Sequence, residues 1–244
     1  MEKNRIVFFD SGVGGITLLK EFLTRCPSAS CAYFGDNENA PYGNRAEGEI
    51  RRLAENAFGR IALLSPRAAV IACNTVTAEC ADALRKKYSF PIVGIEPAVR
   101  PAAAAVGKGR ILLLATHATL ASARVRELIR KNCGQCTIVP HCPALLAGEI
   151  ERNIFDLSRI RLETHIPRGG YAAVVLGCTH YIFLRERIGE FCRCPVFDGN
   201  AGTADHLANI VNICSKNMSE ISKNPPIFLG NGAKINEAIY YSMR

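Results

Sequence analysis

The segments VIACNT at 70–75 and VVLGCTH at 174–180 decide how this chain folds. In each segment, a run of mostly apolar residues ends at a cysteine that small polar residues follow. Such a run predicts a strand buried in a parallel sheet, with the cysteine at the carboxyl end of the strand. Open α/β sheets bind their ligands outside those strand ends. The two cysteines, one in each half of the chain, therefore suggest a pair that acts on one substrate from opposite sides.

The order of strands and helices around these cysteines occurs twice along the chain. Cys73 and Cys178 lie 105 residues apart, and the strand starts at Arg5 and Arg110 have the same offset. This pattern predicts an α/β fold of two similar doubly wound parallel-sheet domains, related by a pseudo-twofold axis, with the active site in the cleft between them. Any two α/β units repeat with a similar period, but this alone does not place both cysteines at equivalent strand ends. The predicted strands are 5–9, 31–36, 67–73, 91–95, 110–115, 135–141, 172–178 and 195–199.

The break between the two domains falls near 96–109, which contains two prolines and a run of alanines. We predict that residues 97–209 form the second domain and that residues 1–96 and 210–244 form the first. The tail from about residue 210 has a helical pattern and then a short apolar segment, IFLG at 227–230. We expect this segment to return to the first domain.

The composition describes a chain with enough apolar residues for a core and with a basic surface. Of the 244 residues, 48% are hydrophobic and 21% are charged, a balance typical of globular proteins rather than disordered ones. The net charge of +8 favours anionic partners, but the basic residues are scattered and no aromatic residues lie among them. We therefore expect a solvated basic surface and no nucleic-acid partner.

Neither a membrane partner nor export is expected. No stretch approaches the roughly 18 uninterrupted apolar residues of a membrane helix, and the apolar stretch at the N-terminus is too short for a signal peptide. We expect a cytoplasmic protein, where thiols stay reduced, and the eleven cysteines are therefore expected to be core residues, catalytic groups or metal ligands more often than disulfides. Cys133 and Cys136 have C-x-x-C spacing, with His141 and Cys142 nearby. Because two ligands adjacent in sequence fit a tetrahedral zinc site poorly, we expect no metal there.

Two loops at strand ends offer candidate binding residues. The turn DSGVGG at 10–15 joins the first strand to the first helix, whose free N–H groups favour an anion such as a carboxylate. The turn lacks the P-loop lysine, so nucleotide binding is weakly supported. Asp10 stands at the strand end, where a catalytic role and a capping role are both open. In PYG at 41–43, the N–H and hydroxyl groups of Tyr42 could hold a ligand, although a plain turn is the simpler explanation.

The residues that follow the two cysteines suggest reactive thiols. Each cysteine precedes hydrogen-bonding side chains at the start of a helix, where the positive potential is expected to lower the pKa of a thiol. A histidine in the second segment could stabilise a thiolate or relay a proton. Two buried structural cysteines are the alternative, against which their equivalent placement argues. The two tripeptides are Cys73-Asn74-Thr75 and Cys178-Thr179-His180.

The motifs DSGVGG, PYG, ACNT and LGCTHY, in this order and spacing, resemble those of the cofactor-independent aspartate/glutamate racemases. The resemblance covers almost the whole chain. It implies an isomerase that interconverts L- and D-glutamate without a cofactor and supplies D-glutamate for peptidoglycan, the bacterial cell wall. It also implies glutamate as the small-molecule partner, and homodimers are common in this family.

By the same resemblance, Cys73 and Cys178 act as the paired acid and base. Inverting a stereocentre needs a base on one face of Cα and an acid on the other, so one cysteine enters as a thiolate and the other as a thiol. Cys73 becomes the base toward D-glutamate, tuned by Asp10, and Cys178 becomes the base toward L-glutamate, tuned by His180. The implied substrate contacts are Asp10, Ser11, Tyr42, Gly43, Asn74, Thr75, Thr179 and His180, and further candidates are Thr116, Thr119, Glu149 and Glu151.

The chain departs from the family pattern at three places. Ile182 follows LGCTHY where proline is common, and Ala115 stands where glycine is usual. The acidic residue expected after the Cys-Pro pair is either Glu149 or Glu151, neither at the usual spacing. The closest alternative function is a racemase of aspartate or another small amino acid. A non-catalytic ligand-binding module, against which the intact cysteine pair argues, and a pyridoxal enzyme are the alternatives from other classes.

Overall fold

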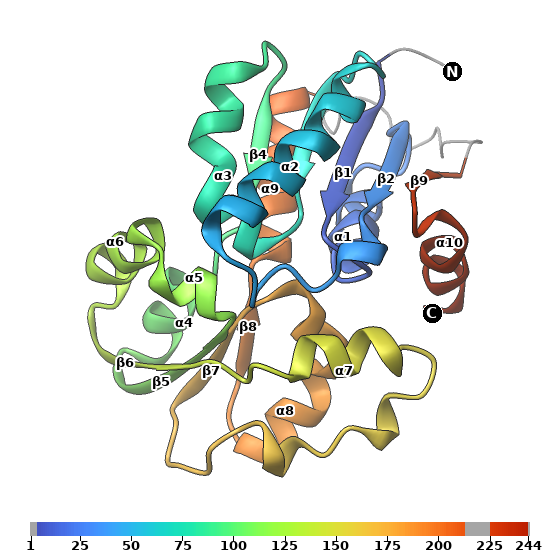
Figure 1. The fold of residues 1–244 in the computed structure, drawn as a ribbon. Helices are drawn as coiled ribbons and strands as arrows, with labels where there is room; N and C mark the ends of the chain where they lie inside the picture. The colour runs from blue at the N-terminus through green and yellow to red at the C-terminus, as the bar shows by residue number, and fades with distance from the viewer. Residues whose placement is uncertain (1–3, 213–224, 244) are drawn as a thin grey trace.

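The structure is a computed structural model that describes residues 4–212 and 225–243. The described residues form two sheets whose neighbouring strands are all parallel, and helices cover both faces of each sheet (Figure 1). This arrangement confirms the predicted α/β fold with two doubly wound parallel sheets.

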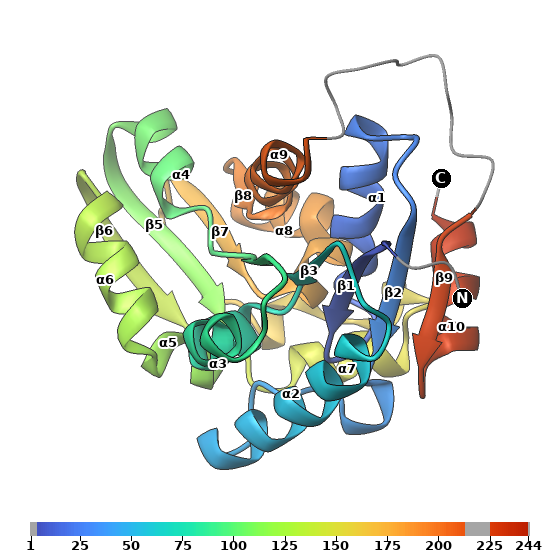
Figure 2. The ribbon, with the colours of Figure 1, turned by 90° about the horizontal axis from the view of Figure 1, so that it is seen from above.

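The first sheet has the strand order β4-β3-β1-β2-β9. Both of its faces are buried, which explains why its central strands are apolar throughout rather than alternating. Helices α1 (Ile16–Arg25) and α9 (Asn200–Val211) cover one face, and α2 (Glu47–Ala62) and α3 (Asn74–Lys87) cover the other (Figure 2). The strands are β1 (Ile6–Asp10), β2 (Cys31–Gly35), β3 (Ala68–Ile71), β4 (Ile92–Gly94) and β9 (Ile227–Gly230), and α10 (Ala233–Ser242) follows β9.

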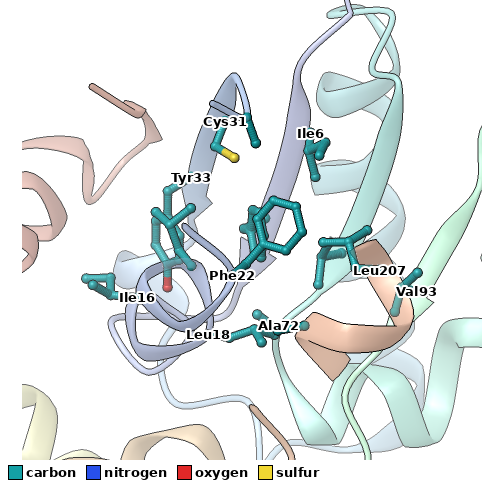
Figure 3. Close-up of a cluster of buried hydrophobic side chains, with 14 of the residues drawn as sticks. Ile6, Ile16, Leu18, Phe22, Cys31, Tyr33, Ala72, Val93 and Leu207 are labelled. Carbon is teal, nitrogen blue, oxygen red and sulfur yellow. The ribbon is translucent and has the colours of Figure 1, made fainter. Parts of the chain in front are cut away.

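A core on one face of the first sheet holds the turn that carries Asp10. Phe22 of α1 packs against the strands of this sheet, and Leu207 of α9 belongs to the same buried cluster (Figure 3). Tyr33 of β2 is buried in this core, and its hydroxyl donates a hydrogen bond to the carbonyl of Gly12 at 2.8 Å. The hydrogen bond from Tyr33 therefore attaches the 10–15 turn to this core.

The second sheet has the strand order β6-β5-β7-β8. Helices α4 (Val99–Val106) and α6 (Ala123–Asn132) bury one of its faces, and α7 (Leu146–Arg152) and α8 (Arg185–Cys192) bury the other. Short helices α5 (His117–Ala121) and η4 (Thr179–Leu184), the latter a 3₁₀ helix, follow two of the strand ends. The strands are β5 (Lys108–Ala115), β6 (Gln135–His141), β7 (Ala173–Gly177) and β8 (Val196–Asp198).

Each sheet has a point where the strand order reverses. In the first sheet β2 and β3 lie on opposite sides of β1, and in the second sheet β6 and β7 lie on opposite sides of β5. Such a switch point opens a crevice at the carboxyl ends of the strands. Cys73 follows β3 and Cys178 follows β7. The two cysteines, 105 residues apart, therefore lie at equivalent strand ends.

The C-terminal part of the chain contributes to the first sheet. The IFLG segment forms β9, which pairs with β2 in the register Ala32 to Ile227. Helix α9 packs against α1 and buries Ala204 and Leu207 in the first core. We therefore propose that the first domain resumes near residue 200 rather than at residue 210. Most of the helix expected from about residue 210 lies outside the described residues.

Candidate active site

The two switch points contribute to one small cavity. Cys73 is 5% exposed and Cys178 is 6% exposed, and both have an extended backbone just before a helix. The cavity has a volume of about 10 Å³, which is room for about one water molecule. Its wall consists of residues from both halves of the chain, namely Ser11, Pro41, Tyr42, Gly43, Cys73, Asn74, Thr75, Thr116, Ala147, Cys178, Thr179 and His180. The predicted site residues from four separate motifs thus meet in one place.

Asp10 lies fully buried at the end of β1, next to this cavity. Its Oδ1 accepts a hydrogen bond from the backbone N–H of Gly12 at 2.8 Å, and its Oδ2 accepts one from the hydroxyl of Thr179 at 3.1 Å. Because Thr179 follows β7, the second contact joins the two halves of the chain. Burial raises the pKa of Asp10 to about 6, although the nearby His180 opposes this shift. Asp10 therefore titrates much closer to neutral pH than an ordinary aspartate.

Cys73 has a protonated thiol at neutral pH. Burial and then the negative charge of Asp10 raise the pKa of Cys73 to about 12. Two contacts oppose this shift: the hydroxyl of Ser11, which lies 3.5 Å from Sγ, and the backbone N–H of Val76. The helix start does lower the pKa of this thiol through the N–H of Val76, but the expected net lowering is wrong, because the loss of hydration outweighs both contacts. In this form Cys73 can serve as an acid.

Cys178 lies beside a hydrogen-bonded chain. Its Sγ is 3.7 Å from Nδ1 of His180, whose Nε2 is 2.5 Å from Oε1 of Glu151. Burial lowers the pKa of His180, but the contacts with Cys178 and Glu151 outweigh burial and hold this pKa well above its usual value. The imidazole is thus a cation placed between a thiol and a carboxylate.

The structure distinguishes Glu151 from Glu149. Both lie on α7, and two residues of separation point their side chains to different faces of a helix. Glu151 accepts hydrogen bonds from His180 and, at 2.9 Å, from the backbone N–H of Val13. Glu149 instead contacts Nε2 of His165 at 2.9 Å, on the wall of a different pocket. Of the two candidates, Glu151 belongs with the cysteines and Glu149 does not.

Polar groups of the remaining wall are arranged for a ligand. The hydroxyls of Thr75 and Thr116 are 2.9 Å apart, and that of Thr116 is 2.9 Å from the hydroxyl of Thr119, which is buried behind the wall. Oδ1 of Asn74 is buried and has no hydrogen-bond partner within the described part of the protein. A buried acceptor without a donor is costly, so this oxygen is suited to a donor that a ligand brings.

The Tyr42 hydroxyl has a different partner from the one expected. It donates to Oδ2 of Asp36 at 2.5 Å, so it is not free to bind a ligand. Asp36 follows the carboxyl end of β2 and is absent from the site residues predicted above, although its place at a strand end could have indicated it. Gly43 lies against Thr116, whose Cβ and Cγ2 a β-carbon at Gly43 would overlap. Both Tyr42 and Gly43 line the cavity, and the phenol hydroxyl is engaged by Asp36.

The remaining expectations concern metals, membranes and the departures from the family pattern. Within residues 4–212 and 225–243, no cluster of three His, Cys, Asp or Glu side chains is arranged to hold a metal ion. No helix among those residues is long and apolar enough to cross a membrane. Ile182 and Ala115 pack into the two cores of the second sheet, so both departures are accommodated by packing.

Comparisons with known proteins agree with this geometry. The family model described as Asp/Glu/Hydantoin racemase matches residues 18–207. The chain is 37% identical over 215 residues to the glutamate racemase of Clostridium acetobutylicum, covering 85% of this chain and 84% of that protein. It is 39% identical over 232 residues to the glutamate racemase of Clostridium kluyveri, covering 91% and 90% of the two chains.

Solved structures are similar over nearly the whole chain. The crystal structure of a glutamate racemase isoform from Bacillus anthracis has a TM-score of 0.77 and 26% identity, and covers 97% of this chain and 91% of that one. The Escherichia coli glutamate racemase, crystallised with L-glutamate and an activator, has a TM-score of 0.78 and 26% identity. The match covers 98% of this chain and 93% of the Escherichia coli chain.

Proposed function

This chain belongs to the Asp/Glu/Hydantoin racemase family, and we propose that it interconverts L- and D-glutamate by a two-cysteine mechanism. The observation that carries the proposal is the pair Cys73 and Cys178, at equivalent switch points on the wall of one cavity. The names of its relatives support glutamate as the substrate, and the Escherichia coli relative was crystallised with L-glutamate.

In the direction from L- to D-glutamate, Cys178 acts as the base and Cys73 as the acid. The Cys178 thiolate removes the α-proton from one face, and the Cys73 thiol donates its proton to the opposite face. Afterwards Cys178 is a thiol and Cys73 a thiolate, so the reverse direction uses the same groups in exchanged roles. The imidazolium of His180 lies 3.7 Å from the Sγ of Cys178, and the pKa of Cys73 near 12 keeps its proton available.

The transition state carries negative charge near Cα, and the polar wall is suited to stabilise it. Fixed dipoles in a cavity that excludes water act more strongly on such charge than water does. The hydroxyls of Ser11, Thr75 and Thr116 and the N–H of Gly43 are donors suited to the two substrate carboxylates. The unpartnered Oδ1 of Asn74 and the carboxylate of Asp10 are suited to the substrate ammonium group. These assignments need no group other than the side chains and backbone of the chain.

Circular dichroism of a panel of L-amino acids incubated with the protein tests the substrate. We expect the signal of L-glutamate to decay fastest. A faster decay of L-aspartate would overturn glutamate as the substrate and would favour the alternative, a racemase of aspartate or another small amino acid.

Substitution of each cysteine tests the mechanism. Cys73→Ser and Cys178→Ser should each abolish racemisation, because a serine hydroxyl is too weak an acid to exchange protons with Cα at neutral pH. Cys194→Ser, which alters a partly buried cysteine outside the cavity, is the matched control and should retain activity. Full activity of either cavity variant would contradict the two-cysteine mechanism.

The proposal extends to the cell. We propose that the protein supplies D-glutamate for peptidoglycan in the cytoplasm; nine cysteines of the described residues are free thiols, and Cys26 is disulfide-bonded. Growth of a D-glutamate auxotroph that expresses the chain, without added D-glutamate, tests this role. We also propose a homodimer, on the family resemblance alone, which light scattering of the purified protein tests.

A further inference from the structure

The C-terminal segment of the described chain is attached to the loop after β2 by asparagine side chains. Figure 2 shows β9 alongside β2, with α10 following it. Asn37 and Asn236 exchange two amide hydrogen bonds, at 2.9 and 3.2 Å. Asn231, between β9 and α10, donates from Nδ2 to Oδ1 of Asp36 at 2.7 Å and accepts at Oδ1 from the backbone N–H of Glu38 at 3.3 Å.

Asp36 connects this attachment to the cavity wall. Besides the bond from Asn231, its carboxylate accepts the hydroxyl of Tyr42 at 2.5 Å and the side-chain amide of Asn39 at 3.0 Å. Its backbone N–H donates to the carbonyl of Asp10 at 3.1 Å. The carboxylate is therefore held from one side by the C-terminal segment and holds Tyr42 on the other.

Tyr42 in turn fixes the loop that lines the cavity. The residue is 1% exposed, so its hydroxyl has little access to water as a replacement partner. Tyr42 and Gly43 both belong to the cavity wall, and Gly43 meets Thr116 of the second half of the chain. A change in the orientation of Asp36 would therefore move the loop that lines the cavity.

We propose that Asn231 is a positioning residue for substrate binding, acting through Asp36 and Tyr42 on the backbone of the loop at 41–43. The inference rests on the proposed function, because it assigns this loop to a substrate carboxylate. It predicts an effect on the Michaelis constant rather than on turnover. The hydrogen bonds of the two cysteines go to Ser11 and His180 and not to Asn231, Asp36 or Tyr42, so the chemistry on bound substrate should stay intact.

Steady-state kinetics of Asn231→Ala with glutamate test the inference. Loss of the hydrogen bonds that Asn231 makes with Asp36 and Glu38 should raise KM by about three- to tenfold, and kcat should stay within about twofold of the wild type. Asn37→Ala is the matched control, because it weakens the same attachment without touching the bond to Asp36. It should leave KM within about twofold.

A double variant separates this inference from general loosening of the segment. In the Tyr42→Phe background, which lacks the hydroxyl, Asn231→Ala should raise KM no further. An unchanged KM in Asn231→Ala, an equal rise in Asn37→Ala, or a full further rise in the double variant would each overturn the role of Asn231. Absence of glutamate racemisation by the wild-type protein would instead overturn the proposed function.

Discussion

Asp10 is a residue whose burial costs stability. Its pKa rises from 3.8 to about 6 in the folded protein, which therefore binds this proton more tightly than the unfolded chain does. The stability that this proton contributes is present below about pH 4 and is lost as the pH rises through about 6. The shift corresponds to about 3 kcal/mol at neutral pH. We expect Asp10→Asn to lose racemisation but to unfold at a higher temperature than the wild type at pH 7.

Thermal unfolding followed by circular dichroism measures this effect. The difference between Asp10→Asn and the wild type should shrink as the pH falls to about 4, where the wild-type carboxyl is protonated. A variant that is less stable than the wild type at pH 7 would show that the bonds from Gly12 and Thr179 outweigh the cost of burial.

His180 owes its raised pKa to its contacts with Cys178 and with Glu151. In Glu151→Gln the charge of one of these two partners is lost, so the pKa of His180 should fall. Nuclear magnetic resonance of the imidazole protons across a pH titration measures this value. Glu149→Gln, on the same helix but directed at His165, is the matched control and should leave the pKa of His180 unchanged. An equal fall in both variants would contradict the assignment.

At the residue scale, the sequence predicted which side chains lie together. It did not predict which glutamate of α7 faces the site or which residue accepts the hydroxyl of Tyr42. The cysteines and the polar residues that follow them were predictable because strand ends place them at one edge of a sheet. The choice between Glu149 and Glu151 was not predictable, because it depends on how α7 is rotated against the first half of the chain. The partner of Tyr42 was hidden for the same reason: it depends on the path of the loop between 36 and 42.

The loop at 41–43 packs so closely against the start of helix α5 that no atom can be added between them. A β-carbon at Gly43 would overlap the side chain of Thr116, which caps α5. Gly43→Ala should therefore displace the loop and raise KM for glutamate by roughly tenfold or more. Gly48→Ala is the control, because nothing lies within 4 Å of that position in α2. It should retain activity and stabilise the helix by about 0.5–1 kcal/mol. Unchanged kinetics of Gly43→Ala would contradict the tight contact.

At the element scale, the strands and the long helices were predictable and the segment after β6 was less so. The predicted strand at 67–73 corresponds to β3, which α3 follows. Between β6 and β7 the structure has α7 followed by two 3₁₀ turns, Leu157–Arg159 and Leu162–Thr164. Single turns bury too few periodic residues to leave a pattern in the sequence.

On the scale of the whole molecule, the two halves meet at Gly14. A β-carbon there would lie 2.8 Å from the backbone nitrogen of His180 and would overlap the hydroxyl of Thr179. Gly14→Ala should therefore fold but hold the halves apart, and kcat should fall by roughly a hundredfold. Gly202→Ala in α9, where nothing lies within 4 Å, should keep full activity. Wild-type kcat in Gly14→Ala would show that the halves do not need this close approach.

The repeated order of strands and helices predicted the two similar sheets. The path of the C-terminal segment was only partly predictable. The apolar segment at 227–230 indicated a return to the first half, yet its place beside β2 follows from strand pairing that sequence does not specify. The packing of α9 on α1 joins segments about 180 residues apart, and such contacts leave no local pattern. The chain of bonds through Asn231 depends on that same long-range arrangement.

The central claim is that two cysteines act on opposite faces of one carbon. Racemisation of L-glutamate in deuterium oxide, stopped after a few per cent of turnover and analysed by mass spectrometry, tests it most directly. A two-base mechanism predicts that the D-glutamate formed carries deuterium at Cα, because the Cys73 thiol has exchanged with solvent, while the remaining L-glutamate carries none. Deuterium appearing in both enantiomers at equal early rates would indicate a single base and would contradict the two-cysteine mechanism.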